Sequence, residues 1–153
     1  MSPAPRPPTI LHAGLICAWR AGRWRGALIL GPSGSGKSQL ALSALSQGWR
    51  LVADDRVLVW ADGNQVYGRS PEPLSGLIEV RGLGVVPSSV PIRAFCTIDL
   101  VVHLTPAAAI ERLPDRAVER VAGHPVARFA LDGFSTHSLA TLALALERLP
   151  VRP

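Results

Sequence analysis

One stretch of the chain has the residue types and the spacing of a phosphate-binding loop. It reads GPSGSGKS and comprises Gly31, Pro32, Ser33, Gly34, Ser35, Gly36, Lys37 and Ser38. Glycines at these positions let backbone N–H groups converge on phosphate oxygens, and a following helix directs its positive end at the same place. Lys37 would reach the β- and γ-phosphates of a nucleotide, and the Ser38 hydroxyl would ligate Mg²⁺. The pattern predicts a nucleotide site without identifying the reaction.

A pair of carboxylates follows this loop one predicted helix later. Asp54 and Asp55 end the segment WRLVADD, which is typical of a strand and is expected to run beside the strand of the loop. There, one carboxylate can hold the metal shell while the other accepts a proton from an attacking hydroxyl. Two solvated aspartates at the start of a turn are the alternative. After a phosphate loop, the pair favours phosphoryl transfer.

The elements that must position these residues alternate in the way of an α/β domain. Helices are predicted over 38–48, ending at a glycine, and over 136–149. Strands are predicted over 9–19, 26–30, 49–55, 57–60, 65–68, 96–104 and, as a pair, 117–131. The Gly-, Pro- and Ser-rich segment 70–91 is expected to be a long irregular region, of the kind that is often functional.

The length of 153 residues suits one domain with a single core. We expect that domain over 9–149, a flexible Pro-rich tail over 1–8 and a short tail over 150–153. No apolar run is long enough to span a bilayer and the first residues do not form a secretory signal, so a cytoplasmic location is expected. Cys17 and Cys96 are too few for a disulfide scaffold or a zinc site, and are expected to be buried free thiols.

The net charge of +5 comes from arginines, since Lys37 is the only lysine among sixteen basic residues. A positive field attracts nucleotides, acidic proteins or nucleic acid without choosing between them. The arginines are spread along the chain and form no single basic helix, so nucleic-acid binding is disfavoured.

Other candidates are ambiguous when only their own surroundings are considered. His12, on an apolar strand, has the pattern of a core histidine, and Glu79 in LIEVRGLG is either a surface carboxylate or a ligand on a pliable loop. His103, His124 and His137 lack metal-ligand spacing and receive no role.

Taken together, the motifs resemble one family, the catalytic domain of bacterial HPr kinase/phosphorylase. The resemblance rests on ILHAGL near the start, the phosphate loop, QGWRLVADDRV after one helix, LIEVRGLGVV, and IERLPD, and it spans about residues 9 to 148. It implies a phosphate-loop fold related to phosphoenolpyruvate carboxykinase, with a mixed sheet flanked by helices. The N-terminal regulatory domain of long members is not part of this chain, which is expected to be a short form.

The resemblance also implies roles for individual residues. His12 and Lys37 fall on the active-site histidine and the loop lysine, and Arg112 falls on the arginine that stabilises the transferring phosphoryl group. Asp55 falls on the residue that deprotonates the target serine and, in the reverse reaction, protonates the leaving serine. Ser38 and Glu79 fall on Mg²⁺ ligands. The candidate site is thus catalytic at His12, Lys37, Asp55 and Arg112, with a metal held by Ser38, Asp54 and Glu79.

The function implied is an ATP- and Mg²⁺-dependent serine kinase acting on HPr or an HPr-like carrier of the phosphotransferase system, assembled as a hexamer. The reverse reaction, phosphorolysis, is less strongly implied, because FALDGFST stands where the family carries a Pro/Arg/Gly-rich loop associated with dephosphorylation. Two other hypotheses remain: a small-molecule kinase with the same site, and a regulatory module that senses ATP without turnover.

Overall fold

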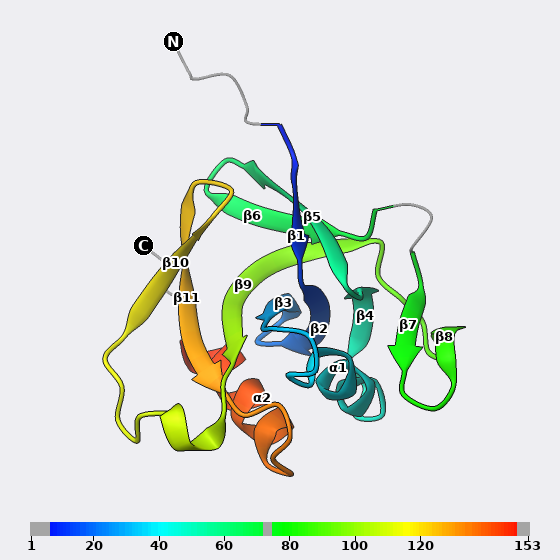
Figure 1. The fold of residues 1–153 in the computed structure, drawn as a ribbon. Helices are drawn as coiled ribbons and strands as arrows, with labels where there is room; N and C mark the ends of the chain where they lie inside the picture. The colour runs from blue at the N-terminus through cyan, green and yellow to red at the C-terminus, as the bar shows by residue number, and fades with distance from the viewer. Residues whose placement is uncertain (1–6, 72–74, 150–153) are drawn as a thin grey trace.

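The structure, a computed structural model, describes residues 7–71 and 75–149 (Figure 1). Of the predicted tails, residues 1–6 and 150–153 lie outside this range, while residues 7 and 8 have no regular structure. The chain forms a mixed α/β fold. Its elements are β1 (Thr9–His12), β2 (Gly14–Arg20), β3 (Arg23–Leu30), α1 (Lys37–Leu45), β4 (Arg50–Ala53), β5 (Arg56–Asp62), β6 (Gln65–Arg69), β7 (Leu77–Val80), β8 (Gly84–Pro87), β9 (Phe95–Leu104), the 3-10 turn η1 (Ala107–Ala109), β10 (Ala117–Val121), β11 (His124–Leu131) and α2 (Ser138–Arg148).

A mixed sheet runs in the order β1-β5-β6-β9-β3-β2-β4, and the β10–β11 hairpin joins it through β11 and β9. The strands β3, β9 and β11 are parallel, with Leu30 opposite His103 and Leu104 opposite Leu131. Their carboxyl ends therefore meet at one edge of the sheet. Short runs of buried apolar residues occupy the middle of β3 (Ala27, Leu28, Ile29) and of β9 (Leu100, Val101, Val102), as expected for strands covered on both faces.

Strand β9 carries the curvature of the sheet. Its first residues pair with β6 in the antiparallel sense, and its later residues pair with β3 and β11 in the parallel sense. The ribbon in Figure 1 curls accordingly, with β9 bending from the β5–β6 layer toward the helices. Two cores result, one between the sheet and both helices and a second formed by strand and turn residues alone inside the curl. The helices thus cover one face of the sheet.

Gly26 of β3 lies very close to the neighbouring strand β9, next to an irregularity in their pairing. A Cβ atom at this position would lie 2.1 Å from the Thr97 carbonyl oxygen and 2.6 Å from the Cys96 sulfur. The missing side chain lets Cys17 and Cys96 approach across β3, and both are free and buried, as predicted. A hydrogen bond between the two thiols lowers the pKa of Cys17 and raises the pKa of Cys96, which burial raises further.

Three sequence predictions differ from the structure. The strand predicted over 9–19 is two strands, because the chain turns at Ala13, whose N–H donates to the Asp55 carbonyl (3.0 Å). Strand β4 does not lie beside β3, because β2 of the β2–β3 hairpin stands between them. The segment 70–91 is not wholly irregular, since the LIEV and GVVP strands pair as the hairpin β7–β8.

The other predicted elements are confirmed, including both helices and the strands that pair as the β5–β6 and β10–β11 hairpins. Within the described residues no helix is long and apolar enough to cross a membrane.

Candidate active site

The phosphate-loop sequence connects β3 to α1, as its pattern predicted. Gly34 and Gly36 have φ values of 80° and 102°, which side chains rarely adopt, so glycine is required at both. Gly36 caps α1, and the helix begins at Lys37. The Lys37 ammonium donates to the carbonyls of Gly31 and Pro32 (2.5 and 3.0 Å), which holds its charge over the loop.

Asp54 is buried and uses both carboxylate oxygens. Its Oδ1 accepts from the Ser38 hydroxyl (2.9 Å), and its Oδ2 accepts from the backbone N–H of Glu79 (2.8 Å). Although β4 is not next to β3, it runs in the same direction, because both are antiparallel to β2. Asp54 therefore reaches α1 from the same edge of the sheet, and one carboxylate ties the first turn of α1 to β7.

Asp55 points elsewhere and has an unusual backbone. Its φ of 70° is in the left-handed region, and its Oδ1 lies 2.6 Å from Nε2 of His12. The conformation is held by neighbouring backbone bonds, from Ala13 N–H to the Asp55 carbonyl (3.0 Å) and from Arg56 N–H to the Asp54 carbonyl (2.8 Å). A non-glycine residue kept in this region stores strain, which is characteristic of functional sites.

The histidine and aspartate of this pair are both exposed, with 59% and 56% of their side-chain surfaces accessible. His12 is therefore not a core histidine, contrary to what its apolar strand suggested. An exposed pair at this distance would add little to folding stability. Its placement at the end of β1, opposite Arg56, leaves it open to a substrate from outside.

Two predicted site residues remain apart from this cluster. Glu79 lies on β7, with its backbone bound to Asp54 and its side chain exposed. Arg112 is exposed in the connection between η1 and β10, which leaves the sheet at the same edge as the phosphate loop. Within residues 7–71 and 75–149, no hydrogen bond or ion pair joins the Glu79 or Arg112 side chains to the rest of the predicted site.

A further residue was missed from the sequence. Gly133, after β11, packs against the phosphate loop so closely that a Cβ atom would lie 2.4 Å from the Ser35 carbonyl oxygen. Its contact also reaches Gly36, whose own Cβ would lie 3.2 Å from the Gly133 carbonyl oxygen. The Asp-Gly pair in FALDGFST is typical of a turn, but nothing in the sequence indicates that this turn contacts the phosphate loop.

We expect Gly133→Ala to weaken nucleotide binding by about tenfold, because overpacking costs about 1–3 kcal/mol and this contact is with loop backbone that cannot rotate away. Titration with a fluorescent nucleotide measures the change. Gly14→Ala is the matched control, since a Cβ atom there would lie 3.8 Å from its nearest neighbour. Equal affinities for the two variants would contradict a supporting role for Gly133.

The described residues contain no group of three or more His, Cys, Asp or Glu side chains arranged to hold a metal ion. Any divalent ion at Ser38 would therefore take most of its ligands from phosphate and water, which is the usual coordination of Mg²⁺ at nucleotide sites.

A glycine-rich loop between a buried strand and a helix, with a carboxylate bound to the first serine of that helix, is the arrangement expected of a phosphate-binding loop. The HPr Serine kinase C-terminal domain matches residues 11–142, and the chain belongs to that family. The predicted resemblance is therefore confirmed.

Individual relatives agree. The chain is 43% identical over 97 residues to HPr kinase/phosphorylase of Lacticaseibacillus casei (strain BL23), an alignment that covers 58% of this chain and 30% of the relative. It is 38% identical over 133 residues to HPr kinase/phosphorylase of Bordetella avium (strain 197N), covering 80% of this chain and 43% of that one. The chain thus spans less than half the length of these relatives.

Among solved structures, the Hpr(Ser) kinase/phosphatase from Coxiella burnetii has the same fold. The TM-score is 0.75 at 23% identity, and the match covers 90% of this chain and 87% of that chain. This likeness establishes the curled mixed α/β fold.

Proposed function

We propose that the chain is an ATP- and Mg²⁺-dependent serine kinase that phosphorylates HPr or an HPr-like phosphocarrier protein. The observation that carries the proposal is the His12–Asp55 pair, in which a strained backbone holds an exposed carboxylate 2.6 Å from the imidazole. The names of the relatives supply HPr as the acceptor. The matching phosphate-loop pattern supplies the nucleotide.

Mg²⁺ fits the donor set at the start of α1. The Ser38 hydroxyl donates a hydrogen bond to Asp54, so a lone pair of the hydroxyl oxygen is left for the ion. Asp54 would orient Ser38 from outside the first coordination shell, because both its oxygens accept hydrogen bonds. Glu79 would add a carboxylate from β7. When bound, Mg²⁺ would neutralise charge on the β- and γ-phosphates.

The loop also fits phosphate. The Ser35 hydroxyl is buried and lacks a hydrogen-bond partner among the described residues. Such a group is costly to leave unpaired, and a phosphate oxygen is an acceptor of the right kind. The Lys37 ammonium would leave the loop carbonyls to pair with the phosphates.

Transfer of the γ-phosphoryl group to the serine would depend on how the site residues position the reacting groups. Asp55 accepts the proton of the incoming serine hydroxyl. As it does so, the serine oxygen forms a bond to the γ-phosphorus, and the bond between the γ-phosphorus and the oxygen that leaves with ADP breaks. His12 holds the Asp55 carboxylate in position, and Lys37 and Arg112 stabilise charge on the transferring group. Arg112 is exposed, and its side chain would have to turn toward the phosphates when substrate binds.

Phosphorolysis would use the same groups in reverse, with inorganic phosphate attacking phosphoserine to give pyrophosphate and Asp55 returning the proton to the serine. The proposal extends to a homohexamer in the cytoplasm and to a fold related to phosphoenolpyruvate carboxykinase, on the strength of the family resemblance.

The proposal is tested by mixing the chain with ATP, Mg²⁺ and the HPr-like protein of its own source, and locating the phosphate by mass spectrometry. Phosphate on one serine of the carrier is the expected result. Nucleotide binding without transfer to any carrier protein or small hydroxylated metabolite would instead favour an ATP-sensing module.

A further inference from the structure

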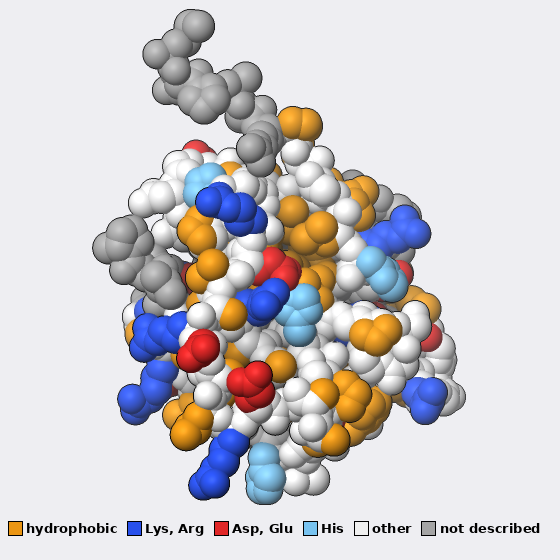
Figure 2. Space-filling view, turned by 60° about the vertical axis from the view of Figure 1, so that its left-hand side comes forward, with side chains coloured by type: hydrophobic (Ala, Val, Ile, Leu, Met, Phe, Trp, Pro, Cys, Tyr) orange, Lys and Arg blue, Asp and Glu red, His pale blue; other side chains and the backbone are white. Residues whose placement is uncertain are grey.

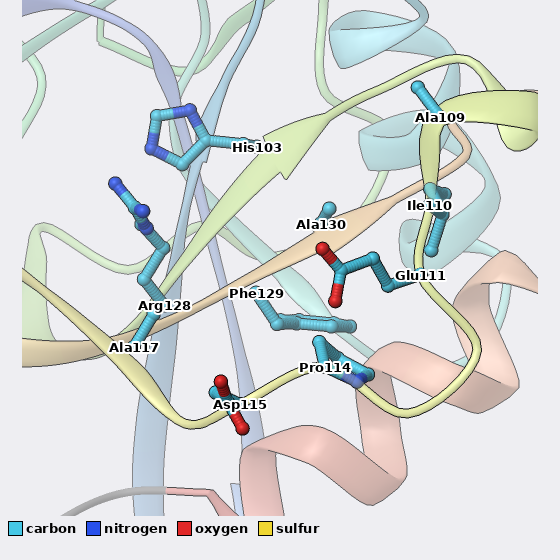
Figure 3. A pocket seen from close by; sticks show the side chains of 10 residues that line it. All are labelled: His103, Ala109, Ile110, Glu111, Pro114, Asp115, Ala117, Arg128, Phe129 and Ala130. Carbon is cyan, nitrogen blue, oxygen red and sulfur yellow. The ribbon is translucent and has the colours of Figure 1, made fainter.

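A cavity of about 480 Å³ lies at the same edge of the sheet as the phosphate loop, bounded by β9, β11 and the segment that follows η1 (Figure 3). It exists because β10 pairs with β11 only as far as Ala117 opposite Arg128, which leaves the last residues of β11 without a neighbour on that side. The charged and aromatic residues that line this cavity, together with one histidine, are His103, Glu111, Asp115, Arg128 and Phe129.

The positive groups of the cavity are already partly neutralised. Glu119 accepts from both of them, with its Oε1 lying 2.8 Å from Nε2 of His103 and 3.5 Å from Nη1 of Arg128. In Figure 3 the His103 and Arg128 side chains extend toward one another at one end of the cavity. They form a polar wall whose own charge is close to balanced when the imidazole is neutral.

The lining also includes two carboxylates. Glu111 and Asp115 are exposed, and neither side chain forms a hydrogen bond or ion pair with the described residues, 7–71 and 75–149. In Figure 3 the Glu111 side chain reaches from its segment toward the Phe129 ring. The lining does not include Arg112 or Arg116 of the same segment.

Among the side chains that line the cavity, two carboxylates stand against one guanidinium, within a chain whose net charge is +5. Figure 2 presents a face where acidic, basic and histidine side chains lie next to one another. A carboxylate beside an aromatic ring, with a second carboxylate elsewhere in the same lining, suits a guanidinium or ammonium group, through charge-assisted hydrogen bonds and the face of the ring.

The cavity is near enough to the phosphate loop to act on the same substrate. His103 lines it and is the register partner of Leu30, the last residue before the loop. Strand β11 is two strand spacings from β3, or about 10 Å. An extended peptide covers that distance in about three residues.

We propose that this cavity is a specificity subsite for an arginine or lysine side chain on the protein whose serine is phosphorylated. The inference rests on the proposed function, because it assigns the cavity to that acceptor. The basic residue would lie within about three to four residues of the serine, or at a similar distance in space.

The first experiment tests cation recognition without any transfer. N-acetyl-argininamide is titrated into the full chain and followed by NMR, with the neutral isostere N-acetyl-citrullinamide as the reference probe. We expect millimolar binding of the arginine probe, weaker binding of the citrulline probe, and about tenfold loss of arginine binding in the Glu111→Gln/Asp115→Asn double variant. Asp62→Asn, at an exposed turn carboxylate, is the matched control and should bind normally.

Phe129→Leu separates the ring from the carboxylates. It keeps an apolar side chain against the core but removes the aromatic face, so arginine binding should fall several-fold in a variant that thermal unfolding shows to be still folded. Equal binding of the two probes, or unchanged arginine binding in the double variant, would overturn the proposal.

The second experiment places the cation on the acceptor. In the double variant the KM for the carrier protein should rise about tenfold, with kcat and the KM for ATP unchanged. An unchanged KM for the carrier, with arginine binding lost, would show a site for free small cations and overturn the proposal. Failure to transfer phosphate at all, with carboxylate-dependent arginine binding intact, would contradict the proposed kinase function instead.

Discussion

Serine phosphorylation should fall on the order of 10³-fold in kcat when Asp55 is replaced by asparagine, because a general base contributes about 10²–10⁴. Asparagine is the right replacement for structural reasons. It tolerates the left-handed conformation that Asp55 adopts at φ 70°, and it keeps the size of the side chain that contacts His12. Nucleotide affinity should stay near the wild-type value, since the Ser38–Asp54 bond is untouched.

Steady-state phosphorylation of the carrier protein gives kcat, and nucleotide titration gives the affinity. The matched control is again Asp62→Asn, which removes an exposed carboxylate at the β5–β6 turn and should retain full activity. If Asp55→Asn keeps wild-type kcat, the proton has another acceptor. A combined His12→Gln/Asp55→Asn variant should be no slower than Asp55→Asn alone if the histidine acts only through this carboxylate.

The second large effect is expected from Lys37→Met. The variant keeps the length of the side chain and removes the charge that lies over the Gly31 and Pro32 carbonyls. We expect kcat/KM for ATP to fall on the order of 10³-fold, because charge stabilisation supplies most of phosphoryl-transfer catalysis. Initial rates over a range of ATP concentrations measure this loss.

Lys37→Arg tests whether charge alone is sufficient. A planar guanidinium cannot match the compact ammonium between two carbonyls and the phosphates, so only partial recovery is expected. Since Lys37 is the only lysine of the chain, an amine-reactive reagent would label this residue and the N-terminus alone, and ATP should protect the lysine. Labelling that ATP does not slow would place the nucleotide elsewhere.

The site was most predictable where chemistry dictates spacing. Gly34, Gly36 and Lys37 had to occupy fixed positions for a loop to hold phosphate, so the strand, the loop and the helix followed directly from the pattern. The hairpin β7–β8 was not foreseen, because Gly82 and Gly84 were interpreted as signs of an irregular loop, whereas Gly82 lies in its turn and Gly84 begins β8. Local composition cannot distinguish a glycine in a turn from one in a loop.

Contacts between residues that are distant in the sequence could not be predicted, for a different reason. The position of β2 between β3 and β4 depends on which edge of a strand is free, and the contact of Gly133 with Ser35 depends on the whole β9–β11 crossover. Neither leaves a mark in the residues themselves. His12 shows the same limit, because its apolar neighbours are those of a buried strand, while its own side chain lies at an exposed strand end.

The branching of β9 has a consequence for how the chain folds. This one strand receives β6, β3 and β11, which come from distant parts of the sequence. Contact order is therefore high, and closing such large loops before any pairing is gained slows the search for the native topology. The phosphate loop follows β3 and packs against Gly133, which follows β11. It can therefore adopt its native position only after both β3 and β11 have paired with β9. Competence to bind nucleotide should thus be one of the last properties a newly made chain acquires.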